Sequence, residues 1–239
     1  MDSIKIDSCS TKMVAHRGLS GIELENTNAA FIAAGNRSYF GIETDVHKTA
    51  DGKFVVFHDD TTGRVGEKNV TVEETTFDEL RAMRLIARDG VTDRIDMHIP
   101  TLREYTSTCK RYDKTAVLEL KNEFTAEEIH AILDEINEEA YLDHVIFISF
   151  AFINLVYVRE LYPEQPVQFL TSQYADDLNQ ILKAHSFDID IEYTQLTKER
   201  IEKFHAYGVK VNCWTCDDKE TAEKLAEYGI DYITSNILE

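Results

Sequence analysis

Two histidines stand directly after short apolar runs, beside residues that could handle a phosphate. His16 and Arg17 follow Met-Val-Ala, and His58 and Asp59 follow Phe-Val-Val-Phe. Imidazole can accept and donate a proton near neutral pH, and the planar guanidinium of Arg17 matches the oxygens of a phosphate. A lone histidine is more often a surface or core residue, so it is the pair with its charged neighbours that indicates proton transfer at a bound anion.

Three carboxylates could form a set of oxygen ligands for a metal ion. Glu43 and Asp45 lie two residues apart, so on a strand both side chains point to one face. Such carboxylates repel each other unless a cation or a proton separates them, and Glu119, from another run, could complete the set. Oxygen ligands without cysteine favour Mg²⁺ or Ca²⁺ over zinc. The alternative for an isolated Glu-x-Asp pair is that it caps nearby amides or pairs with Arg and Lys.

Other polar residues are weaker candidates. Lys121 offers a point charge to a phosphate. Trp214 either packs in the core or lines a pocket, and Cys213 and Cys216 form a Cys-x-x-Cys pair without the context of a redox or zinc site. Six histidines lack comparable neighbours and are treated as background: His47, His98, His130, His144, His185 and His205.

The elements that must position these side chains alternate along the chain. Strand-like apolar runs occur at 13–15, 41–45, 54–57, 116–120, 145–149, 167–170, 188–191, 209–213 and 230–234. Amphipathic helical segments separate most of them, which predicts parallel pairing. About eight such units in roughly 250 residues predict an α/β fold of the (β/α)8 TIM-barrel class. A doubly wound open sheet is the alternative.

One of the nine runs is expected to stand outside the barrel. Asp51-Gly52 precedes the run at 54–57 and is typical of a tight turn rather than a crossover helix. We therefore expect a short excursion between the strand end at His58 and the strand that carries Glu119. Residues 1–239 are expected to form a single domain.

Helix ends are also marked. Thr125 with Glu128 three residues later is a capping-box signature, and Gly208 and Gly229 are expected to end two helices.

Composition restricts the partners. The formal net charge is -19, from 44 acidic and 25 basic residues, which disfavours binding to nucleic acid or anionic lipid. No apolar run is long enough to span a membrane, no signal peptide is recognisable, and four cysteines are too few for a disulfide scaffold. A reduced, cytoplasmic protein, monomeric or homodimeric, is expected.

Seven stretches, in order along nearly the whole chain, resemble the glycerophosphodiester phosphodiesterase family, in its compact bacterial form. They are AHRG, ENTNAAF, GIETDVHKTADGKFVVFHDD, IPTLREY, LELK, VNCWTCDD and GIDYITSN. The resemblance implies a barrel enzyme that hydrolyses glycerophosphodiesters to sn-glycerol 3-phosphate and an alcohol, with a cyclic phosphate intermediate. Two departures are Leu24, where the family usually has proline, and 61–96, which follows the pattern loosely and helps to shape the entrance.

By position, the resemblance implies roles for eight residues. Glu43, Asp45 and Glu119 would hold one divalent cation, His16 and His58 would be the acid–base pair with His16 as the first base, Arg17 and Lys121 would hold the phosphate, and Trp214 would flank the glycerol. Glu25 is expected behind these residues.

Three alternatives remain at this point. A related barrel enzyme of phospholipase D type could act on lysophospholipids or sphingomyelin, but it would need apolar access for an acyl chain. A non-catalytic protein could capture phosphodiesters, although pure binding needs no proton shuttle. A metal-dependent sugar isomerase on the same fold is disfavoured by the basic pair Arg17 and Lys121.

Overall fold

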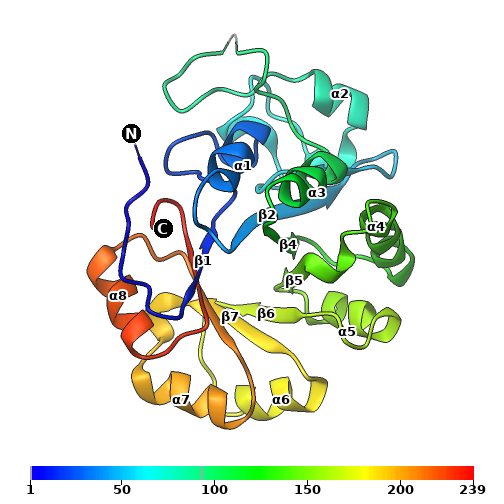
Figure 1. The fold of residues 1–239 in the computed structure, drawn as a ribbon. Coiled ribbons are helices and arrows are strands. Elements are labelled where there is room, and N and C mark those ends of the chain that lie inside the picture. The colour runs from blue at the N-terminus through cyan, green and yellow to red at the C-terminus, as the bar shows by residue number, and fades with distance from the viewer. Residues whose placement is uncertain (1, 93) are drawn as a thin grey trace.

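The computed structural model describes residues 2–92 and 94–239, and its strands form a closed barrel (Figure 1). Among the described residues, eight parallel strands pair in the order β1-β9-β8-β7-β6-β5-β4-β2, and β2 pairs with β1 to close the ring. This confirms the predicted TIM barrel and excludes the open sheet. The bounds are β1 Lys12–Ala15, β2 Gly41–Lys48, β4 Thr115–Leu120, β5 Val145–Ser149, β6 Val167–Thr171, β7 Asp188–Glu192, β8 Val211–Trp214 and β9 Tyr232–Ser235.

The ninth strand stands outside the barrel, as the turn at Asp51-Gly52 predicted. β3 (Phe54–Val56) runs antiparallel to β2, with Val46 opposite Val56 and Lys48 opposite Phe54. Gly52 has a φ of +75°, which suits the tight connection between the two strands. β3 thereby pairs with the last residues of β2, and the antiparallel chain direction brings His58 back to the carboxyl ends of the barrel strands.

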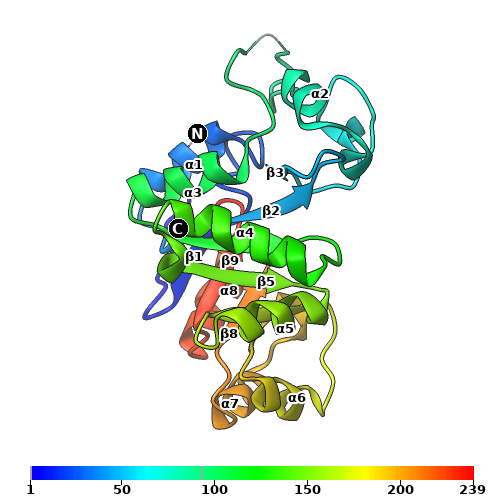
Figure 2. The ribbon, with the colours of Figure 1, turned by 90° about the vertical axis from the view of Figure 1, so that its right-hand side faces the viewer.

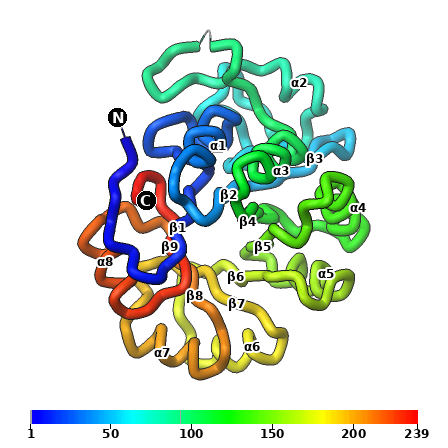
Figure 3. The backbone as a smooth tube through the Cα atoms, in the orientation of Figure 1, coloured from blue at the N-terminus to red at the C-terminus, as the bar shows by residue number. Residues whose placement is uncertain are grey.

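Helices surround the ring, as Figure 3 shows in the same orientation. They are α1 Asn28–Gly35, α3 Leu102–Arg111, α4 Ala126–Glu138, α5 Phe152–Leu161, α6 Leu178–His185, α7 Lys198–Ala206 and α8 Lys219–Glu227. The predicted capping box of α4 is present, because Thr125 Oγ1 accepts from the Glu128 amide at 3.2 Å and Glu128 Oε2 accepts from the Thr125 amide at 2.8 Å. Gly208 and Gly229 follow α7 and α8 with φ near +80°.

The strands separate two buried regions, one between the strands and the surrounding helices and one inside the ring. Odd-numbered residues of β7, Ile189 and Ile191, pack outward against the helices in the main core. The inside of the ring is filled in part by a smaller apolar cluster that includes Val14, Val117 and Ile148. The even-numbered positions of β7 therefore point into the ring, since successive strand residues face opposite sides.

Residues 59–92 and 94–100, called the excursion, form a lobe beside the barrel (Figure 2). They contain the 3-10 helices η1 (Thr62–Arg64) and η2 (Val72–Glu74) and the helix α2 (Phe77–Ala82). The excursion has its own buried core, made by Leu24, Val55, Phe57, Val65, Val72, Leu80, Leu85, Met97 and Ile99. Leu24 belongs to this core, which gives a physical reason for an apolar side chain at that position.

The two ends of the described chain lie side by side between α8 and α1, where Ile4 bridges to Leu238. Within the described residues, no helix combines the length and apolar character needed to cross a bilayer.

Candidate active site

The carboxyl ends of β2 and β4 bring three acidic side chains together inside the ring. Glu43 and Asp45 share one face of β2, and Asp45 lies beside Glu119 in the parallel register of β2 and β4. Each offers an oxygen within 4.8 Å of the others, and all three are buried. Among the described residues, this is the one group of His, Cys, Asp and Glu side chains close enough to hold a metal ion.

The chemistry of this acidic group fits a hard divalent cation. Buried Asp45 Oδ1 and Glu119 Oε1 have no hydrogen-bond partner among the described residues, although Lys121 Nζ lies 3.1 Å from that oxygen of Glu119. Burial, then Asp45 and Glu119, raises the pKa of Glu43 well above its ordinary value. Burial, then Asp45, raises the pKa of Glu119 to about 8. A cation among these oxygens would offset both the burial and the mutual repulsion of the carboxylates, and would thereby favour their ionised forms.

His16, directly after β1, is oriented by a chain of hydrogen bonds from neighbouring strand ends. Asn236 donates from Nδ2 to Asp217 Oδ2 at 2.6 Å, so its Oδ1 faces His16 and lies 2.8 Å from Nδ1. An amide oxygen only accepts, so Nδ1 carries the proton and Nε2 is left with a lone pair. Nε2 lies 3.9 Å from Glu43 Oε2. Burial, then the charge of Arg17, lowers the pKa of His16 to about 4.

His58, at the end of the β3 segment, is oriented by a carboxylate instead. Its Nδ1 lies 2.6 Å from Asp59 Oδ1, and Arg64 donates from Nε to Asp59 Oδ2 at 2.6 Å. Hydrogen bonds from Arg64 lower the pKa of Asp59 to about 2, so this partner is ionised. The pKa of His58 lies below its ordinary value because of burial, while Asp45 and Asp59 act in the opposite direction.

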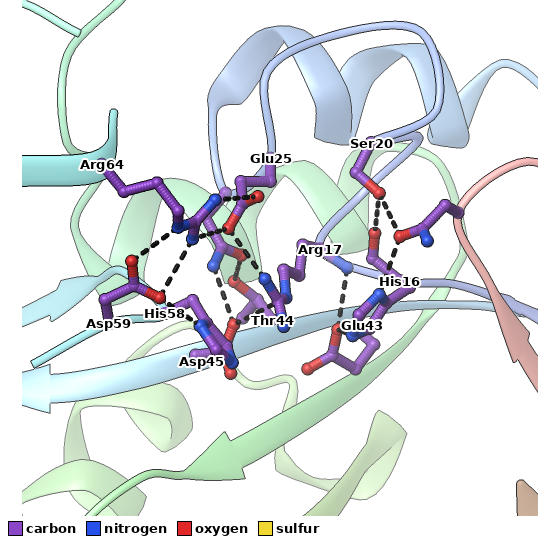
Figure 4. Close-up of polar contacts among 12 residues, drawn as sticks. His16, Arg17, Ser20, Glu25, Glu43, Thr44, Asp45, His58, Asp59 and Arg64 are labelled. Carbon is purple, nitrogen blue, oxygen red and sulfur yellow. Dashed lines mark hydrogen bonds and ion pairs between the residues drawn. The ribbon is translucent and has the colours of Figure 1, made fainter. Parts of the chain in front are cut away.

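Arg64 also shares a carboxylate partner with Arg17. Its two terminal nitrogens donate to Glu25 at 2.8 and 2.7 Å, and Arg17 Nη1 donates to the same carboxylate at 2.9 Å. Figure 4 shows the guanidinium of Arg64 between Asp59 and Glu25. One side chain of the excursion therefore connects His58, through Asp59, with Arg17, through Glu25.

The turn after β1 has a left-handed backbone. Arg17 has a φ of +55°, and its amide donates to Glu43 Oε2 at 2.7 Å. Gly18 follows at +75°, and a Cβ there would lie 2.7 Å from Ala30 of α1. The glycine after His16-Arg17 is required because α1 packs directly against this turn.

A cavity of about 110 Å³ opens among these side chains. Seven of the eight predicted site residues line it, namely His16, Arg17, Glu43, His58, Glu119, Lys121 and Trp214, and Asp45 lies beside them in the acidic group. Trp214 packs edge-on against Phe150, with ring centroids 5.6 Å apart. Trp214 thus combines the two alternatives, since it lines the cavity and also packs against the apolar cluster inside the ring. Cys213 and Cys216 are buried free thiols.

Four further polar groups were not singled out from the sequence as site residues. Asn26 donates from Nδ2 to Asp45 Oδ2 at 2.7 Å, Asn236 orients His16, Arg64 orients Asp59, and Asp190 lines the cavity. Asn26 and Asn236 fall within stretches that carry the family resemblance, and Asp190 alternates with outward isoleucines in Asp-Ile-Asp-Ile-Glu. Arg64 has no such signal, since its segment follows the pattern only loosely.

Fold and site together define a barrel enzyme whose strand ends carry two histidines, two cationic side chains and an acidic group that could hold a metal ion. Comparison with known proteins agrees, because the model of the glycerophosphoryl diester phosphodiesterase family matches residues 16–238. The chain belongs to this family and is a phosphoric diester hydrolase.

Two bacterial relatives match over nearly their whole length. YhdW of Bacillus subtilis is 32% identical over 234 residues, which cover 94% of this chain and 93% of YhdW. A glycerophosphodiester phosphodiesterase of Caldanaerobacter subterraneus is 29% identical and covers 95% of this chain and 94% of its own.

A solved structure is similar in fold. An Oleispira antarctica phosphodiesterase, in complex with the product sn-glycerol-3-phosphate, has a TM-score of 0.84 and 25% identity over 98% of this chain and 96% of its own.

Proposed function

We propose that this chain hydrolyses water-soluble glycerophosphodiesters to sn-glycerol 3-phosphate and an alcohol, with His16 and His58 as the acid–base pair. The observation that carries the proposal is the arrangement of the two imidazoles. Each uses Nδ1 for a hydrogen bond to Asn236 or Asp59, and each lines the cavity that contains the acidic group and both cations. Two proton-transferring groups beside two cationic side chains that can bind an anion suit the hydrolysis of a phosphodiester.

In the first step, His16 Nε2 takes the proton of the substrate's own glycerol 2-hydroxyl. That oxygen forms a bond to phosphorus, and the bond between phosphorus and the leaving oxygen breaks. His58, protonated and stabilised by Asp59, gives its proton to the departing alkoxide. The products of this step are a cyclic phosphate and the free alcohol, and no proton or electron pair is left unaccounted for.

In the second step the roles are reversed. His58, now neutral, takes a proton from water, and the water oxygen attacks phosphorus. The bond to the glycerol 2-oxygen breaks, and His16 returns its proton to that oxygen. Arg17 and Lys121 hold the phosphoryl oxygens in both steps. Their positive charge stabilises the negative charge that develops on these oxygens in the transition state.

Glu43, Asp45 and Glu119 would hold the divalent cation, Mg²⁺ or Ca²⁺, whose contribution when bound is neutralisation of charge on the phosphoryl oxygens. Three carboxylates whose oxygens lie close together, two of them buried without a hydrogen-bond partner among the described residues, suit a hard ion of this kind.

A panel of diesters, assayed with and without EDTA, tests the proposal. We expect metal-dependent release of glycerol 3-phosphate from glycerophosphocholine or a related diester, restored by adding Mg²⁺ or Ca²⁺. Absence of hydrolysis across the panel would refute the substrate class. Faster turnover of micellar lysophospholipid than of water-soluble diesters would instead favour a lipase. Unchanged product release by a His58→Ala variant would refute the acid–base roles.

A further inference from the structure

One wall of the cavity carries a buried carboxyl group that the reaction above does not use. Asp190 lies on β7, lines the cavity and is only 1% exposed. Its Oδ1 has no hydrogen-bond partner among the described residues. Because a buried polar atom is stabilised only when it is hydrogen-bonded, a carboxyl placed at a cavity wall is suited to a polar group of a ligand.

The side chains next to Asp190 in this wall are apolar. Ile148 of β5, Leu170 of β6 and Trp214 of β8 line the same cavity. Trp214 Nε1 lies 3.4 Å from the backbone oxygen of Asp190, so the indole is anchored to the same strand. The part of the lining that comes from β5 to β8 therefore combines an apolar surface with the carboxyl of Asp190, and Glu119 of β4 lies nearby. Apolar walls with a few polar groups are the usual composition of a site that orients a small ligand.

Three other polar side chains inside the ring, Gln168, Asn212 and Thr234, are hydrogen-bonded to one another. Asn212 donates to Gln168 Oε1 at 3.1 Å and accepts from Thr234 Oγ1 at 3.3 Å. Asp190 is the register partner of Asn212 on the neighbouring strand, yet it takes no part in this group. The side chains of Gln168, Asn212 and Thr234 therefore have partners among themselves, whereas the carboxyl of Asp190 lines the cavity with one oxygen unbonded.

We propose that the Asp190 carboxyl hydrogen-bonds the terminal hydroxyl of the substrate's glycerol unit and thereby selects diesters that carry this hydroxyl. This inference rests on the proposed function. The attacking hydroxyl must face His16, so the terminal hydroxyl is the one left to meet the wall of Asp190 and Trp214. A carboxyl accepts a hydrogen bond from a hydroxyl in either protonation state.

The size of the cavity supports the glycerol unit as the occupant. The cavity measures about 110 Å³. A space this small suits a compact polyol better than a polyol together with a bulky leaving alcohol. The leaving alcohol therefore points out of the cavity, and Asp190 contacts the glycerol unit, which all these substrates share.

The test compares two synthetic substrates with the same leaving alcohol. One is the glycerol 3-phosphodiester, and the other is the matching propane-1,2-diol diester, which keeps the attacking hydroxyl and lacks the terminal one. For the wild-type protein with Mg²⁺, we expect kcat/KM to favour the glycerol diester by about 10²-fold or more, because sites built to bind a hydroxyl reject analogues that lack it.

Variants at Asp190 locate the preference. Asp190→Leu and Asp190→Ala are expected to lose far more activity on the glycerol diester than on the propanediol diester, so that the ratio falls to near one. Asp190→Asn, whose amide still hydrogen-bonds, is expected to keep most of the preference. The matched control is Asp188→Ala, which changes the same face of β7 two residues away, where Asp188 accepts from the Lys210 amide outside the cavity.

Three outcomes would overturn the inference. An equal loss on both substrates in Asp190→Leu and Asp190→Ala would mean that Asp190 supports the barrel only. A wild-type ratio near one would refute hydroxyl selection without any variant. Hydrolysis of neither substrate by the wild-type protein would refute the proposed function as well, whereas hydrolysis of both with equal kcat/KM would refute this inference alone.

Discussion

The two histidines of the site are held by two different regions of the molecule. His16 is oriented from within the barrel, since Asn236 directly follows β9 and Asp217 follows β8. His58 is oriented from the excursion, where Asp59 is fixed by Arg64 of η1. The regular region thus supplies a neutral amide partner, and the irregular region supplies an ionised carboxylate that is fixed by an arginine.

This difference matches the roles proposed for the first step. A neutral acceptor fixes the tautomer of His16, while burial and then the charge of Arg17 keep its pKa low, which suits a base that starts neutral. An ionised carboxylate stabilises the imidazolium of His58, which suits an acid that starts protonated. In the proposed mechanism, the two histidines therefore differ in role because the groups that orient them differ in charge: Asn236 is neutral and Asp59 is ionised.

The largest expected effect is common to both regions. His16→Ala and His58→Ala should each lower kcat on glycerophosphocholine by about 10²–10⁴-fold, because each histidine transfers a proton in both steps. Steady-state assays with Mg²⁺ would measure this, with His130→Ala on the exposed face of α4 as the control. A loss under about tenfold in either variant would mean that the two regions do not contribute equally.

The next effect concerns the excursion. Arg64→Ala should lower kcat/KM by about 10²-fold, since charged hydrogen bonds of roughly 2–3 kcal/mol hold both Asp59 and Glu25. KM should rise together with the fall in kcat, because Arg17 is positioned through Glu25.

The matched control is another arginine of the excursion. Arg81 pairs bidentately with Glu104 at 2.7 Å, away from the cavity lining. Arg81→Ala should lose a comparable ion pair and keep kcat/KM. An equal loss of activity in the two variants would show that the excursion supports the site only through its overall stability.

A smaller effect is expected on the barrel side. Asn236→Ala should lower kcat by about tenfold, because it removes one neutral hydrogen bond of roughly 1 kcal/mol together with the preference for one tautomer. Asp217 acts on His16 through Asn236, so the double variant Asp217→Asn/Asn236→Ala should be little worse than Asn236→Ala alone. Multiplied effects in the double variant would disprove this chain of contacts.

The smallest effect is expected far from both histidines. Thr125→Ala removes the side-chain cap of α4 and should reduce the free energy of unfolding by about 1 kcal/mol. Activity below the unfolding transition should stay within twofold of wild type. Denaturant titration and kcat/KM measured side by side would check this, and a parallel loss of activity would link barrel stability to the site.

Much of the fold was predictable because its signals are local. Alternating runs such as 188–191 and 230–234, the capping box at Thr125 and the turn at Asp51-Gly52 depend on neighbouring residues only. These predicted the barrel and the strand that lies outside it. The predicted site residues were found through their position at strand ends, where a parallel barrel gathers side chains from distant parts of the chain.

The supporting residues could not be predicted in the same way. Arg64 joins Asp59 and Glu25 only because the excursion folds back over its own core, and Asn236 meets His16 only because β9 pairs with β1. Asp190 lines the cavity only because the closed ring brings β7 opposite the acidic group of β2 and β4.

The sequence alone therefore determined the elements, their order and the chemical groups at their ends, since hydrophobic periodicity and turn chemistry act over a few residues. Only the tertiary structure decided which partner each group meets. Hydrogen-bond geometry and burial depend on the packing of segments far apart in the chain, and these set the tautomer, charge and reach of each side chain.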